Sequence, residues 1–150
     1  MDAHKTINDV LVNLFNEILK LEEKSIITED FKDLTNNDMH VIDAIGLGAG
    51  NNMSVIAKKL KVTVGTLTTS VNSLVNKKYA ERIRSEVDRR VVYVRLTTKG
   101  VRAYEHHSDY HKRMTNAILE KLSPNEIPVL VKTLEGLSEF FRGYGDDSKS

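Results

Sequence analysis

The segment VTVGTLTTSVNSLVNKKYAERIRSEVDRRVVYVRLTTKG, residues 62–100, decides the fold because its hydrophobic period changes halfway along. Its first half has one apolar stripe at helical spacing, formed by Leu67, Val71, Leu74 and Val75. Its second half contains residues 82–84 and 92–96, which alternate with period two as half-buried strands do. The charged residues 86–90 between them predict a hairpin tip. With a short helix expected at about 54–60, the segment predicts a helix-turn-helix followed by a β wing.

Helices are predicted on both sides of this segment. Near the N-terminus, apolar residues recur at helical spacing: Ile7, Val10, Leu11, Leu14, Phe15 and Ile18. Thr35 can cap a second helix, and the glycine cluster 46–50 is predicted to be its C-cap and turn, because it follows a helix and lacks the ending of a phosphate loop. Thr97 or Thr98 begins a long helix to about residue 122. Ser123 and Glu126 form a capping-box signal for a last helix ending near residue 143.

The predicted fold is mainly α with a small β wing, built from six helices plus a β-hairpin. Residues 1–150 are interpreted as one domain, with a winged helix-turn-helix lobe at 34–100 and dimerisation helices at 1–33 and 101–145. The terminal helices carry more apolar surface than one small domain needs, so we expect a homodimer with a two-fold helical interface. The alternative is that these helices only cover the core of the monomer.

The composition narrows the possible functions. The 150 residues are 40% hydrophobic and 29% charged, as in an ordinary globular protein, and they include no cysteine. Disulfides, thiolate metal ligands and thiol nucleophiles are therefore excluded. We expect a cytoplasmic protein without a membrane span, because no secretion signal is visible and the longest uncharged run, 62–76, is shorter than the ~20 apolar residues of a span. No nucleophile pattern, paired-carboxylate cleft or phosphate loop indicates an enzyme.

The net charge of +1 hides a strong asymmetry along the chain. Residues 58–102 contain 12 Lys or Arg and three acids, whereas residues 1–37 contain eight acids and four bases. A basic block beside an acidic one is typical of a footprint for a polyanion such as double-stranded DNA. The alternative is a solvated basic face without a ligand.

The predicted recognition helix has no Arg or Lys from residue 62 to 76, so it cannot supply the common arginine-to-guanine contact. Threonine methyls suit the thymine methyl, and asparagine suits adenine, which predicts an A·T-rich operator. The candidate contacts on this helix are Thr66, Thr68, Thr69, Ser70, Asn72 and Ser73. For each threonine, helix capping or simple solvation is the alternative.

Residues 62–100 resemble the recognition helix and wing of the MarR family of regulators. Asp88-Arg89-Arg90 matches the family's D-x-R wing, residues 96–100 match its L-T-x-x-G helix start, and the order of elements agrees over nearly the whole chain. The resemblance implies that Arg90 enters the DNA minor groove, that Asp88 orients it, and that Arg89 is a second basic contact. The alternative for this pair is a surface ion pair of ~0–1 kcal/mol. The remaining basic candidates are Lys78, Arg82 and Arg84.

Two positions depart from the family pattern. Lys78 stands where the family usually has glycine, and a left-handed backbone there costs a non-glycine residue ~1 kcal/mol. The alternative is a slightly different turn. Ala80 replaces a bulky aliphatic residue at the start of the first wing strand. Both substitutions put the local wing geometry in question, not the fold.

Within the family, residues 39–43, 62–74 and 84–92 are similar to FabT-type repressors of fatty-acid biosynthesis. The resemblance implies repression of fatty-acid genes, with long-chain acyl groups on acyl carrier protein as co-repressor. Lys112 and Arg113 are the guessed contacts for this acidic carrier. The candidate effector pocket comprises Leu14, Phe15, Met39, His40, Ile42, Ile45, Tyr104 and His107. The alternative is that these apolar residues simply fill the core.

Three other interpretations remain open. A MarR-type regulator of another regulon would respond to zinc or to a small phenolic compound. His107 and His111 are four residues apart on one helical face, and His40 lies on another helix, as in zinc-sensing members of the family. Without cysteine or an evident acidic partner, we expect no metal site and no cofactor. The second interpretation is a winged helix that binds proteins and not DNA, and the third is an unrecognised enzyme.

Overall fold

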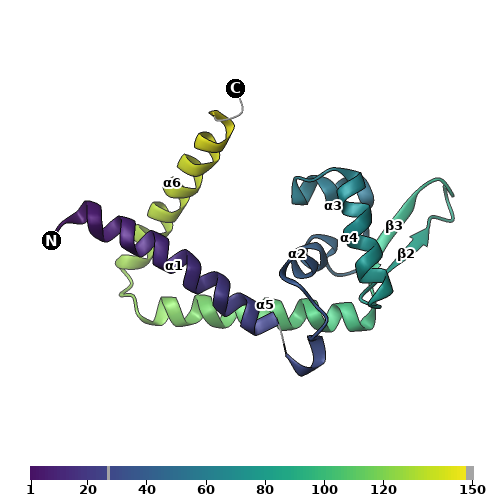
Figure 1. The fold of residues 1–150 in the computed structure, drawn as a ribbon, viewed down its shortest axis with the longest axis horizontal. Helices are drawn as coiled ribbons and strands as arrows, with labels where there is room; N and C mark the ends of the chain where they lie inside the picture. The colour runs from purple at the N-terminus through teal and green to yellow at the C-terminus, as the bar shows by residue number, and fades with distance from the viewer. Residues whose placement is uncertain (27, 148–150) are drawn as a thin grey trace. The chain divides into compact units, whose positions relative to one another are not determined.

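The computed structural model describes residues 1–26 and 28–147 and contains six α-helices, one 3₁₀ turn and a small sheet (Figure 1). The elements are α1 (Ala3–Ile26), η1 (Glu29–Phe31), α2 (Asn36–Ile45), β1 (Asn51–Asn52), α3 (Met53–Leu60), α4 (Val64–Asn76), β2 (Ala80–Arg84), β3 (Val92–Leu96), α5 (Thr98–Glu120) and α6 (Glu126–Asp147). They form two compact units, residues 1–110 and the residues from His111 onward. None of the described helices has the length and apolar character needed to cross a bilayer.

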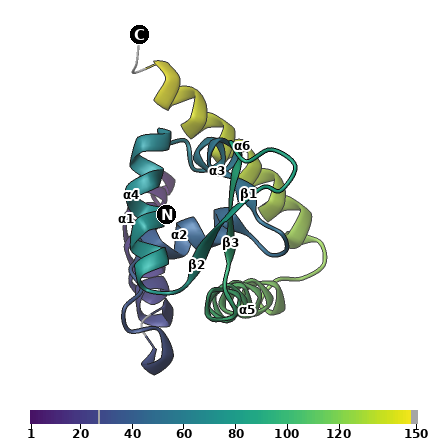
Figure 2. The same cartoon turned by 90° about the vertical axis from the view of Figure 1, so that its right-hand side faces the viewer.

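The wing is an antiparallel sheet of strand order β1-β3-β2 (Figure 2). The pairs Ala80–Leu96 and Arg84–Val92 bound the β2–β3 register, which confirms the predicted hairpin. The sequence analysis missed β1, which pairs Asn51 with Val94. Two asparagines have no alternating apolar pattern, so only the tertiary contact with β3 makes them a strand.

The core lies between α2, α3, α4 and the sheet. Its largest fully buried side chains are Tyr79, Ile42, Ile45, Ile56, Leu67, Leu74, Val71 and Val94. Three members of the predicted α4 stripe are therefore buried, and Val75 packs against the cluster from a half-buried position. The stripe orients α4 so that its opposite face points to solvent.

The predicted starts of α2 and α5 are confirmed, whereas the last helix differs from its prediction at both ends. Thr35 and Asp38 form a reciprocal capping box at α2, and Gly46 ends that helix with φ 71°. Thr97, not Thr98, caps α5, because its Oγ1 accepts a hydrogen bond from the Gly100 amide. The last helix begins at Glu126, not at residue 124, although the Ser123 amide donates to Glu126 Oε2 at 2.8 Å as the capping-box signal predicted. It continues past residue 143 to Asp147, since helical geometry tolerates the glycines there at a propensity penalty only.

Close packing around Gly100 explains why the L-T-x-x-G motif ends in glycine. A Cβ at this position would lie 2.0 Å from the backbone oxygen of Tyr79. The start of α5 can therefore approach the backbone of Tyr79, in the turn between α4 and β2, only without a side chain at residue 100.

The terminal helices expose apolar faces in the single chain. On α1 the exposed residues include Ile7, Val10, Leu14 and Phe15. On α6 they include Val131, Leu134, Phe140 and Phe141. Contiguous apolar surface of this kind marks an interaction surface on each helix.

Candidate nucleic-acid interface

The outward face of α4 presents small polar side chains. Thr63 caps the helix by accepting a hydrogen bond from the Thr66 amide at 3.1 Å. Thr68, Thr69 and Asn72 are exposed, and Ser73 is half-buried. Thr68 Oγ1 donates to the Val64 carbonyl at 2.8 Å, which leaves its methyl group as the outward contact. This surface can make methyl contacts and neutral hydrogen bonds with base edges or phosphates.

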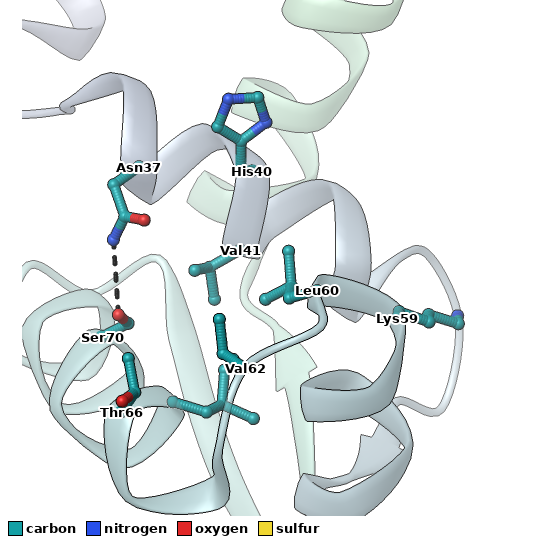
Figure 3. A pocket seen from close by; sticks show the side chains of 9 residues that line it. Asn37, His40, Val41, Lys59, Leu60, Val62, Thr66 and Ser70 are labelled. Atoms are coloured by element: carbon teal, nitrogen blue, oxygen red, sulfur yellow. Dashed lines mark hydrogen bonds between the residues drawn. The ribbon is translucent and has the colours of Figure 1, made fainter. Parts of the chain in front are cut away.

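Thr66 and Ser70 lie on the side of α4 that faces α2. Both line a hollow of about 350 Å³ between α2, α3 and the start of α4 (Figure 3). Ser70 Oγ accepts a hydrogen bond from Asn37 Nδ2 at 3.3 Å, the dashed line in Figure 3. Ser70 is half-buried, whereas Thr66 is exposed like Thr69 and Asn72. The role of Thr66 and Ser70 at a DNA interface stays a prediction.

At the wing tip, Asp88 fixes the orientation of the Arg90 side chain. Arg90 Nε and Nη2 each donate to one Asp88 carboxylate oxygen at 3.1 Å, and the Arg90 amide also donates to Asp88. Hydrogen bonds from the Arg90 side chain and backbone lower the pKa of Asp88, and the same contact raises the pKa of Arg90. The Arg90 side chain is nevertheless 90% exposed, so the guanidinium is oriented while its free edge stays in solvent.

The other wing bases also lie at the surface. Arg82, Arg84 and Arg89 are exposed. Arg84 and Arg89 line a shallow hollow at the wing together with Ser85 and Glu86. Arg82 reaches back to α4, where its Nη2 donates to Asn72 Oδ1 at 2.6 Å. The wing strand and the recognition helix therefore meet in one polar contact.

Of the two alternatives for Lys78, a left-handed backbone or a different turn, the structure has the left-handed backbone. Its φ is 70°, and the next amide, Tyr79 N, donates to the Leu74 carbonyl to close the end of α4. Ala80 is buried and pairs with Leu96 in the sheet. The wing therefore forms even though Lys78 and Ala80 differ from the family pattern, and Lys78 adopts a left-handed backbone that is strained for a non-glycine residue.

Two polar contacts at the end of α4, each with one buried partner, Asp38 or Tyr79, were not predicted from the sequence. Lys77 Nζ donates to Asp38 Oδ2 at 2.7 Å, and Tyr79 Oη donates to Asp33 Oδ1 at 2.6 Å. Burial and the hydrogen bond to Asp33 raise the pKa of Tyr79, and the same hydrogen bond lowers the pKa of Asp33. Lys99 lies 4.3 Å from the centre of the Tyr79 ring. The T-x-x-D spacing of residues 35–38 is the only sequence signal, and it indicates the cap but not the lysine.

The structure distributes the predicted effector residues between core and surface. Met39, Ile42 and Ile45 are buried in the lobe core, and Tyr104 packs against it. Leu14 and Phe15 are exposed on α1, and His40 is exposed on α2. His40 lines the hollow of Figure 3 together with Val41, Leu60 and Val62. The single chain does not bring the eight residues together as one described pocket, and the slot stays a prediction.

His107 has the acidic neighbours that the sequence analysis did not identify. Its Nε2 lies 3.5 Å from Glu22 Oε1 and 3.4 Å from Asp43 Oδ2, and the imidazole is buried. Glu22 and His107 both offer atoms that can bind a metal ion. The carboxylates come from α1 and α2, so their approach to α5 is a tertiary effect. His107 therefore has two acidic neighbours, and the expectation that it has none is wrong.

Comparisons with known proteins agree with this architecture. Residues 32–91 match the MarR family. The structure of Streptococcus pneumoniae FabT in complex with DNA is 41% identical, covers 94% of this chain and 99% of that chain, and superposes with a TM-score of 0.85.

Two curated regulators are more distant relatives. The transcriptional regulator AdcR of Streptococcus pyogenes is 28% identical over 147 residues, covering 92% of this chain and 99% of AdcR. The HTH-type transcriptional regulator PchR of Bacillus subtilis is 28% identical over 120 residues, covering 77% of this chain and 71% of PchR. These relatives are transcriptional regulators and not enzymes. The chain itself belongs to the MarR family of DNA-binding transcriptional regulators.

Proposed function

We propose that this protein is a homodimeric repressor of fatty-acid biosynthesis genes that binds a palindromic, A·T-rich operator in the cytoplasm. The observation that carries the proposal is the wing tip, where Asp88 orients a guanidinium that is 90% exposed. An oriented, exposed cation beside a face of threonine and asparagine side chains fits one minor groove and the adjacent major groove. A purely structural ion pair does not require the arginine to be so accessible.

The exposed apolar faces of α1 and α6 support the homodimer. Phe15 on α1 and Phe141 on α6 are each more than half exposed in the single chain. A second copy of the chain is the simplest cover for such faces, and a two-fold axis would place two recognition helices on one DNA site. The two-fold axis also explains why the operator should be a palindrome.

The similarity to FabT supports the choice of regulon and effector. The resemblance to FabT-type repressors implies that long-chain acyl groups on acyl carrier protein act as co-repressor. Each buried CH₂ contributes ~0.8 kcal/mol, so long chains should bind much more tightly than short ones. Lys112 and Arg113 are exposed on α5, as contacts for the acidic carrier must be. The bound form must favour the DNA-binding conformer, because a ligand with equal affinity for both conformers shifts nothing.

The test is a titration of labelled operator DNA, found by footprinting on the protein's own genome, at several salt concentrations. Long-chain acyl carrier protein, a short-chain form and the unacylated carrier are compared. We expect salt-dependent binding that tightens only with the long chain. If operator affinity does not depend on the acyl chain, the fatty-acid assignment is wrong, but the protein is still a DNA-binding regulator. Absence of DNA binding at low salt would favour a protein-binding winged helix.

A metal-responsive or phenolic-responsive regulator is the second candidate within the family. The position of Glu22 and Asp43 beside His107 favours the metal-responsive form. A histidine and a carboxylate at this separation can share a divalent cation once the imidazole is deprotonated. The same titration with and without zinc separates this candidate from the acyl-responsive one.

A further inference from the structure

We propose that Arg82 and Asn72 act as one base-reading unit that selects guanine at one position of each otherwise A·T-rich half-site. The inference rests on the proposed DNA-binding function and goes beyond it by assigning a base to a pair of residues. It also changes an expectation from the sequence, where asparagine suited adenine and no arginine was available on the recognition helix.

The sheet places Arg82 on the side of the wing that packs against α4. Arg82 pairs with Val94 in the β2–β3 register, and Val94 is fully buried. Directly opposed residues of an antiparallel pair share one face of the sheet, so Arg82 starts from the core-facing side of β2. Its guanidinium leaves the core and reaches the exposed side chain of Asn72 at 2.6 Å.

The contact fixes which way the asparagine amide points. A guanidinium has only donors, so the atom that faces it must be the amide oxygen. Charge-assisted hydrogen bonds of this kind are roughly twice as strong as neutral ones. Asn72 Oδ1 is therefore engaged, and the amide nitrogen, with its two donors, is left to contact a ligand.

Two donors side by side suit guanine better than adenine. Bidentate recognition of adenine requires the amide oxygen to accept from N6 while the amide nitrogen donates to N7. The guanine edge presents N7 and O6, which are both acceptors, and can face the Asn72 amide nitrogen and the remaining N–H groups of Arg82 together. Arg82 thus supplies from β2 the guanidinium that α4 lacks.

The test is selection from a random DNA pool, followed by titration of two operators that differ only by G·C against A·T at the selected position. We expect the wild type to prefer guanine there by about tenfold or more, as good bidentate contacts do. Arg82→Ala should release the Asn72 oxygen and shift the preference at that position toward adenine. Arg82→Lys should lose the preference but keep the salt dependence, because it keeps the charge and loses the fork.

Two arginines of the wing provide matched controls. Arg84→Ala, on the same face of β2, should weaken binding to both operators equally. Arg95 pairs with Glu81 on the opposite face of the sheet, and Arg95→Ala should leave both affinities unchanged. Circular dichroism of each variant checks that it is folded.

Two outcomes would overturn the inference, and they are distinguishable. If Arg82→Ala weakens both operators equally, Arg82 contacts a phosphate and the reading unit does not exist. If the wild type binds no DNA, the proposed function fails as well, and the inference falls with it.

Discussion

Lys77, the residue that ends the recognition helix, is joined to Asp38, the residue that closes the capping box of α2, by a 2.7 Å hydrogen bond. The Asp38 residue is only 4% exposed, and its Oδ2 also accepts from the Thr35 amide at 3.0 Å. One carboxylate therefore caps α2 and holds the end of α4. Together with the apolar core that α2 and α4 share, this side chain holds the DNA-reading helix against α2.

We expect Asp38→Ala to lower the free energy of unfolding by about 1–3 kcal/mol, because it removes a helix cap and a partly buried ion pair together. Urea denaturation measures the change, and an unaltered m-value would show that the unfolding transition remains comparable. Arg95→Ala is the control, since it breaks an exposed pair worth ~0–1 kcal/mol. Equal losses in both variants would contradict the role assigned to Asp38.

Lys78→Gly should relieve the left-handed strain at the end of α4. We expect the free energy of unfolding to rise by up to about 1 kcal/mol from the relieved strain. The greater conformational entropy of glycine in the unfolded chain offsets part of this gain. Operator affinity should fall, because the substitution removes a predicted DNA contact. Lys61 has φ 56° at the end of α3, so Lys61→Gly is a matched control for the backbone effect. A stability gain at residue 61 but none at residue 78 would show that Lys78 is not strained.

Arg90→Ala should weaken operator binding by roughly 1–3 kcal/mol and reduce the salt slope by about one, as expected for a lost groove or phosphate contact. Asp88→Ala should weaken binding less, because it frees the arginine without removing its charge. Titrations at several salt concentrations check both variants. Wild-type affinity in Arg90→Ala would exclude the wing from the interface.

The Asp88–Arg90 contact should not change between pH 5 and 8. The pKa of Asp88 is lowered in the folded protein, so the contact is fully present above the ordinary aspartate pKa of ~3.9 and is lost as the pH falls through the lowered value. A pH-dependent change in operator affinity above pH 5 must come from another group. Repeating the titration with Asp88→Asn identifies any part that this carboxylate causes.

The selected operator should be a palindrome with A·T-rich half-sites whose centres lie about 10 base pairs apart, because a two-fold dimer places its recognition helices one helical turn apart. Selection from random DNA and sequencing of the bound pool measures both spacing and base content. A non-palindromic consensus would argue against the dimer, and G·C-rich half-sites would argue against the threonine face of α4.

Zinc should change operator affinity by less than tenfold, about 1.4 kcal/mol, because the chain has no cysteine and the proposed effector is an acyl chain. The comparison is binding with chelator and with equimolar zinc, in wild type and in His107→Gln. The carboxylates beside His107 could instead bind zinc together with its imidazole, in which case zinc would change operator affinity. A stoichiometric zinc effect that grows with pH and disappears in His107→Gln would favour the metal-responsive regulator.

Local patterns in the sequence were enough to predict the elements of the winged helix-turn-helix lobe. The apolar period of residues 67–75 predicted α4, the alternation at 92–96 predicted β3, and Thr35 predicted the cap of α2. The resemblance to the MarR family implied that Asp88 orients Arg90, and the two side chains are hydrogen-bonded in the structure.

Contacts between distant segments could not be predicted in this way. The strand Asn51–Asn52, the pairing of Asp38 with Lys77, the acids beside His107 and the contact of Arg82 with Asn72 all join different elements. Single-sequence patterns report which face of an element is apolar, but not which polar side chain meets it from elsewhere. The sequence by itself therefore determined the helices, the wing and their caps, since these depend on neighbours along the chain. Tertiary structure alone decided how the reading helix is held and which atoms of Asn72 remain for a base, because packing α4 against α2 and β2 brings those partners within hydrogen-bond distance.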